Sequence, residues 1–91
     1  MSKGTLLFKS KQRMSRKEAA DFLRHLADKI DQGNLTLKQG EQSLELNMPA
    51  EMALDVQVKD KDKGHKGLQH ELEVEIKWYE GGSPTEPLEL E

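Results

Sequence analysis

Five basic residues lie close together in the sequence, near the predicted start of a helix, where they could bind an anion. They are Lys9, Lys11, Arg13, Arg16 and Lys17. The free amide groups of a first helical turn carry partial positive charge, so a phosphate group could be held there. No aromatic side chain interleaves with the five cations, although proteins that bind single strands usually stack bases on such residues. The set is therefore a candidate anion-binding site of low specificity.

Other residues that could do chemistry are dispersed, or lack part of the pattern that the chemistry needs. His25, His65 and His70 are the obvious candidates for general acid–base catalysis, and they fall on three different predicted elements. The segment Asp60–Gly64 lacks the third acidic residue of a calcium loop, and its two lysines would repel a cation. We therefore expect no catalytic residue, no metal site and no cofactor, and we expect the chain not to be an enzyme.

The clearest pattern in the chain is a strict alternation of apolar and polar residues over Leu68–Trp78. Successive side chains of a strand point to opposite faces, so the pattern predicts a strand with one dry face and one wet face. Glu71, Glu73 and Glu75 share the wet face. A catalytic pair of carboxylates needs a pocket that separates two pKa values, and an open sheet face provides none. We interpret this row as a solvated face that keeps the sheet from aggregating.

A helix is predicted from Arg16 to about Gln32. Ser15 and Glu18 have the spacing of a capping box, and Gly33 follows where a left-handed residue is expected to end the helix. Apolar residues recur at helical spacing and predict one apolar stripe: Ala19, Phe22, Leu23, Leu26, Ala27 and Ile30.

Alternation and turn residues predict five strands around this helix: Lys3–Lys11, Asn34–Lys38, Ser43–Met48, Glu51–Lys59 and Leu68–Trp78. We expect an α+β fold with the order βαββββ, in which one helix packs on one face of a five-stranded, antiparallel-rich sheet. The first strand is placed beside Leu68–Trp78, with a position beside the second strand as the rival. Residues 1–80 are predicted to form a single domain, and residues 81–91 a disordered C-terminal tail.

Composition and charge narrow the classes of protein to consider. The chain has 91 residues, 34% of them hydrophobic and 34% charged, and no Cys, which excludes disulfides and Cys-based chemistry. No apolar run is long enough for a membrane span or a signal-peptide core, so we expect a cytoplasmic protein that does not contact membranes. Residues 1–24 carry seven basic and two acidic side chains, whereas residues 68–91 carry one Lys and seven Glu. Lys9 and Lys11 could therefore lie across from the Glu row.

Several segments resemble the amphi-Trp domain family, which is named for an amphipathic strand that ends in Trp. The similar segments are Leu7–Ser10, Arg13–Ala20, Leu23–Ala27, Gly33–Leu37 and Leu72–Trp78. The resemblance covers roughly residues 4–79 and implies no particular activity, so it assigns no site residue.

These observations favour a small, non-enzymatic interaction or binding module. Its expected partner is another protein, which would bind through the sheet face or an edge strand. The alternative is a weak nucleic-acid or phosphate binder that uses the basic strand–helix junction. Such binding would weaken steeply as salt rises.

Overall fold

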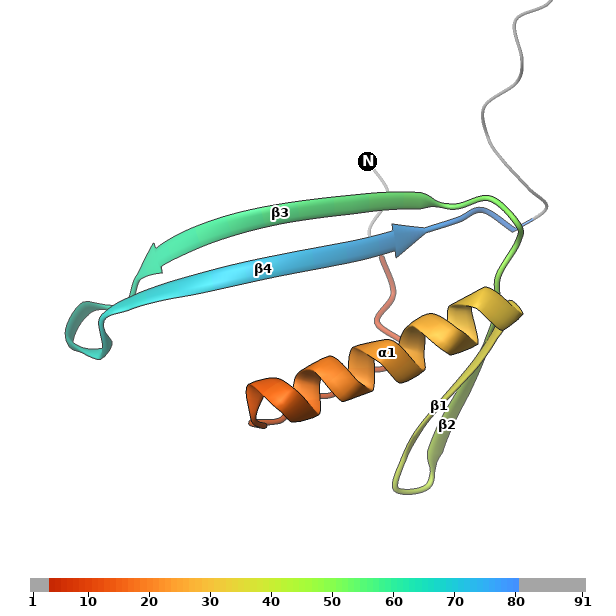
Figure 1. Cartoon of the computed structure of the whole chain (residues 1–91), viewed down its shortest axis with the longest axis horizontal. Helices are drawn as coiled ribbons and strands as arrows, with labels where there is room; N and C mark the ends of the chain where they lie inside the picture. Colours follow the sequence, from red (N-terminus) through yellow and green to blue (C-terminus); the bar gives the residue numbers. More distant parts are fainter. Residues whose placement is uncertain (1–3, 81–91) are drawn as a thin grey trace, which may run out of the picture. The chain divides into compact units, whose positions relative to one another are not determined.

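The helix and the strands fall into two units along the chain (Figure 1). A computed structural model describes residues 4–80. Its elements are α1 (Arg16–Gln32), β1 (Asn34–Gln39), β2 (Gln42–Asn47), β3 (Ala53–Asp62), the short 3-10 helix η1 (Gly64–Lys66) and β4 (Leu68–Lys77). The first unit ends at Met48 and the second begins at Pro49. Within residues 4–80 no side chain is fully buried.

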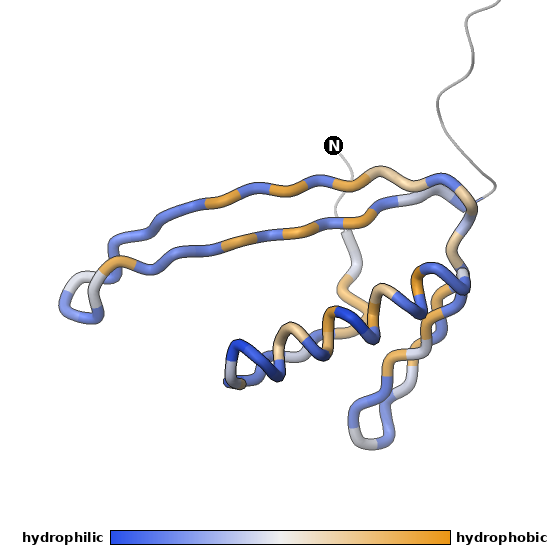
Figure 2. Tube along the Cα trace, viewed as in Figure 1, coloured by the Kyte–Doolittle hydropathy of each residue, from blue (hydrophilic) through white to orange (hydrophobic). Residues whose placement is uncertain are grey.

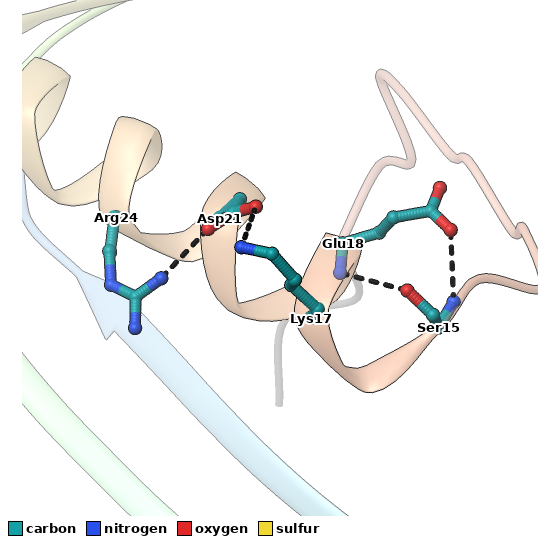
Figure 3. Close-up of polar contacts among 5 residues, drawn as sticks. All are labelled: Ser15, Lys17, Glu18, Asp21 and Arg24. Carbon is teal, nitrogen blue, oxygen red and sulfur yellow. Dashed lines mark hydrogen bonds and ion pairs between the residues drawn. The ribbon is translucent and has the colours of Figure 1, made fainter.

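The predicted helix is confirmed at both of its ends, and Figure 3 shows the first of them. The Ser15 hydroxyl accepts the Glu18 backbone N–H at 3.0 Å, and the Glu18 carboxylate accepts the Ser15 N–H at 3.4 Å. The two bonds satisfy amide groups that have no partner inside the helix. Gly33 ends the helix with φ 82°, and its N–H donates to the Ile30 carbonyl at 3.0 Å.

The first unit is completed by the antiparallel β1–β2 hairpin, which follows α1 directly. Gly40 and Glu41 form its two-residue turn, and only Gly40 has a positive φ, 59°, as a type II′ turn requires. The leucines of both strands are half-buried, as the alternation predicts. Helix α1 contacts β1, whereas Phe22 and Leu23 of the predicted stripe stay more than half exposed.

The second unit is a long antiparallel hairpin of β3 and β4. The register pairs Leu54 with Ile76, Val56 with Val74 and Val58 with Leu72, so the apolar residues of both strands share one face. Figure 2 shows the resulting alternation of hydrophobic and hydrophilic residues along the two strands. The structure therefore confirms that the apolar residues of β4 lie on one face, as the sequence predicts.

The predicted five-stranded sheet is wrong. The four strands form two separate two-stranded sheets, β1 with β2 and β3 with β4, although the fold is still α+β. Residues 4–15 form no strand: the Leu7 carbonyl accepts a bond from the Gln42 side chain at 3.1 Å, not from a neighbouring main chain. Apolar side chains at successive positions, Leu6 and Leu7, give this segment no clean dry face with which to join a sheet.

The break between β2 and β3 has a local cause. Pro49 lacks an N–H and lies in the segment that joins them, so pairing cannot continue through this position. The single domain over residues 1–80 stays a prediction, and the predicted tail at residues 81–91 lies outside the described residues.

Candidate functional site

One face of the β3–β4 hairpin is held together by charged side chains. The ammonium group of Lys61 lies 3.1 Å from the Glu71 carboxylate, and that of Lys59 lies 3.7 Å from Glu73. The Gln57 amide donates to Glu73 at 2.9 Å. Glu71 and Glu73 thus pair with lysines of β3, the neighbouring strand, which corrects the prediction that Lys9 and Lys11 would lie across from the Glu row.

Lys77 closes this charged face at the other end of the hairpin. Its ammonium group lies 3.1 Å from the Glu75 carboxylate and 3.4 Å from that of Asp55. The hydrogen bond to Glu75, followed by its charge and then by Asp55, raises the pKa of Lys77 above its ordinary value of 10.5. The hydrogen bond from Lys61 likewise lowers the pKa of Glu71 below its ordinary value of 4.5.

The two pKa shifts predict the pH range in which the hairpin is most stable. The lowered pKa of Glu71 stabilises the fold above about pH 4.5, and this contribution is lost as the pH falls through the folded-state pKa. The raised pKa of Lys77 stabilises the fold below about pH 10.5, and this contribution is lost at higher pH.

Urea unfolding should show a slightly lower free energy of unfolding at pH 3 than at pH 7, and Glu71→Gln should reduce this difference. An equal loss in both chains would contradict the assignment.

The opposite face of the hairpin is apolar and open. Six large side chains on it have exposed fractions between 57% and 71%: Leu54, Val56, Val58, Leu68, Leu72 and Val74. All six lie on the same side because they occupy alternate positions in a continuous register. Ile76 extends the row and is half-buried, as is Trp78, which follows β4. Contiguous apolar patches of this kind usually mark interaction surfaces. We call these six residues and Ile76 the apolar hairpin face.

A polar pair interrupts the apolar hairpin face near η1. His70 Nδ1 lies 2.6 Å from Asp60 Oδ1, and the two residues are cross-strand partners. The Asp62 carboxylate accepts the Gly64 N–H at 2.8 Å, so this residue shapes the turn into η1. Within residues 4–80 no three His, Asp or Glu side chains gather as a metal-binding group.

The predicted anion-binding residues lie before and within the first turn of α1, and all five are exposed. Lys17 forms an ion pair with Asp21 at 3.4 Å, and Arg24 shares that carboxylate at 2.8 Å (Figure 3). In the described part of the first unit, Lys9, Lys11, Arg13 and Arg16 form no ion pair. The capping Glu18 brings a carboxylate to the same helix end. The cations are therefore neighbours in sequence, and a carboxylate lies at the helix end beside them.

Sequence reasoning missed a groove of about 300 Å³ in the first unit. It lies along β1 and α1 and is also lined by Phe8, Ser10 and Gln12. His25 lines it, whereas His65 lies in η1 and His70 in β4. Among the described strands, β1 has β2 as its single neighbour, and no local pattern of residues signals a missing neighbour.

In the described residues no helix is long and apolar enough to cross a membrane.

Comparisons with known proteins identify the family. A comparison with curated proteins found no match, and a comparison with solved structures found none. The family model of the Amphi-Trp domain matches residues 1–91. This match spans the amphipathic β4 strand and the Trp that follows it, together with the capped helix, and the chain therefore belongs to the Amphi-Trp domain family.

Proposed function

We propose that the chain is a non-enzymatic protein-interaction module that binds through the apolar hairpin face. The observation that carries this proposal is the exposure of six large apolar side chains on one side of β3 and β4. Fully covering one Val or Leu side chain contributes roughly 1.5–3 kcal/mol. Covering six that are about 60% exposed would contribute roughly 5–11 kcal/mol before the cost of association.

The charged face of the same hairpin supports the proposal by contrast. Its ion pairs are solvent-exposed, and such pairs contribute at most about 1 kcal/mol each. Charged groups on this face also keep water and favour solubility over association. Burial of apolar area can therefore contribute more binding free energy on the apolar hairpin face than ion pairs can on the charged face. The expected partner is a protein with a complementary apolar surface. The non-enzymatic part rests on the sequence, which has no Cys and disperses its three His residues.

Adjacent residues on opposite faces provide a direct test. A photoreactive residue replaces Val56 in one chain and Gln57 in another, and each chain is irradiated in its native cell. We expect a discrete crosslink to one protein from position 56 and not from position 57. The same crosslink from both positions, or none from position 56, would overturn the proposal.

Binding of nucleic acid or phosphate is the second candidate function, in which Lys9, Lys11, Arg13, Arg16 and Lys17 would bind the anion. One observation favours it: Glu73 and Glu71 form ion pairs with Lys59 and Lys61 within the hairpin. These carboxylates therefore do not need the five basic residues of the first unit as partners. A mixed oligonucleotide titrated at low and then moderate salt should shift the amide signals of residues 9–18, and the shifts should fade with salt. Unchanged binding after Arg13→Glu and Arg16→Glu would exclude this candidate.

A further inference from the structure

The groove of the first unit runs along the edge of β1. Five consecutive residues, 35–39, line it. Successive side chains of a strand point to opposite faces, so a groove over one face would be lined by the side chains of alternate residues. Contact with all five means that the groove follows the strand lengthwise, at its edge. Phe22 and Leu26 of α1, with Phe8, supply its apolar lining.

The backbone groups of β1 alternate between β2 and this edge. The Met48 N–H donates to the Gly33 carbonyl at 2.8 Å, which marks the pair 33–48 as hydrogen-bonded. Bonded pairs recur at every second residue of an antiparallel ladder, so Leu35 and Leu37 bond to β2. The N–H and C=O groups of Thr36 and Lys38 consequently point away from β2. Among the described strands, β1 pairs with β2 alone.

Side chains around the groove define what an added strand should contain. Leu35 and Leu37 are half-buried, whereas Thr36 and Lys38 are exposed on the other face. An added strand would alternate in the same way, with one set of side chains over Phe22 and Leu26 and the other set beside Lys38. The lining also includes Lys29 and His25 but no carboxylate. Within the described part of the first unit, neither Lys29 nor Lys38 forms an ion pair.

We propose that the β1 edge binds an extended peptide segment of a partner protein in which apolar residues alternate with Asp or Glu. The peptide adds as a strand, and its main chain bonds to Thr36 and Lys38 while its apolar side chains cover the groove. Five residues of β1 at about 3.3 Å each accommodate a segment of about five residues. The proposal goes beyond the proposed function, because it names a partner class at a second surface.

A seven-residue probe tests the alternation and the charge. The capped peptide Glu-Val-Glu-Val-Glu-Val-Glu is titrated into the full chain labelled with ¹⁵N, and amide exchange is measured. We expect at least about tenfold slower exchange at Thr36 and Lys38, and little change at Leu35 and Leu37, whose amides already bond to β2. The matched controls are Glu-Glu-Glu-Glu-Val-Val-Val, with the same composition but no alternation, and Lys-Val-Lys-Val-Lys-Val-Lys. Both should bind more weakly.

Two variants of the chain complete the test. Lys38→Glu should weaken binding of the acidic peptide about fivefold, because it replaces a favourable cross-strand charge with a repulsive one. Thr36→Pro removes an edge N–H without removing a bond to β2, and it should weaken binding as well. Equal binding of the alternating and block peptides would overturn the proposal. So would strong protection of Thr36 and Lys38 in the free chain, since the edge would then already be occupied.

The outcome is separable from that of the apolar hairpin face. Val56→Lys changes the second unit and should leave the affinity for the acidic peptide unchanged. Loss of peptide binding in Lys38→Glu with intact crosslinking from position 56 would assign the two surfaces independent partners. Failure of crosslinking with intact peptide binding would remove the proposed function of the hairpin and leave the β1 edge as the binding site.

Discussion

Gly33→Val should lower the free energy of unfolding by about 2 kcal/mol, the largest loss of stability that we expect from one substitution. Gly33 has φ 82°, a left-handed conformation that costs an ordinary L residue roughly 1–2 kcal/mol and a β-branched residue more. The position cannot relax easily, because its N–H bonds to Ile30 and its carbonyl accepts the Met48 N–H. A Cβ there would lie 3.5 Å from the Met48 carbonyl oxygen, which is ordinary van der Waals contact, so the loss comes from the backbone conformation.

Urea unfolding followed by circular dichroism measures this loss, and the thermal midpoint should fall by about 8–16 °C. Gly33→Asn should cost less, because Asn adopts the left-handed conformation more readily. Gly4→Val is the matched control. Gly4 lies in irregular chain, and a Cβ at this position would have no neighbouring atom within 4 Å. Its replacement should therefore change stability by at most about 0.5 kcal/mol. Equal effects at the two positions would contradict the argument.

The sequence was sufficient for features that neighbouring residues determine. The helix from Arg16 to Gln32, its capping box and its glycine end were all predicted, because each depends on residues within one or two turns. The dry face of β4 was predicted for the same reason, since alternation is a local property. The exposure of the apolar hairpin face was not predicted: a helix was expected to cover one face of the sheet, whereas Val56 and Val58 are at least 60% exposed.

Strand pairing is where local reasoning failed, and the Glu row shows why. Lys9 and Lys11 were placed across from it because their charge was suitable, but Lys59 and Lys61 have the same charge and are much closer in sequence. Closing the short loop of a hairpin costs less conformational entropy than closing a long one. Opposite charges alone therefore do not identify neighbouring strands. The groove along β1 was missed for a related reason: the pairing of β1 with β2 alone, among the described strands, is not a local property of the sequence.

Val56→Lys should separate a binding surface from a core. Val56 is 60% exposed, so a Lys there keeps its ammonium group in water and should change the free energy of unfolding by no more than about 1 kcal/mol. The control Gln57→Lys places the same charge on the opposite face, beside Glu73, and should be equally mild. If Val56→Lys instead lowered stability by several kcal/mol, the apolar hairpin face would be covered within the folded chain, and the proposed function would be wrong.

The affinity for the partner should respond to only one of these two variants. A partner that covers Val56 would bury the new ammonium group without a counter-charge, and the affinity should fall at least about 30-fold, the effect of losing 2 kcal/mol at a central contact. Calorimetric titration with the protein crosslinked through position 56 measures this loss. Gln57→Lys should bind almost as the original chain does, because its face stays in water. A large loss of affinity with unchanged stability is expected of a side chain that packs against a partner and not against its own chain. An equal loss of affinity in both variants would instead show that the added charge, and not the apolar surface, determines binding.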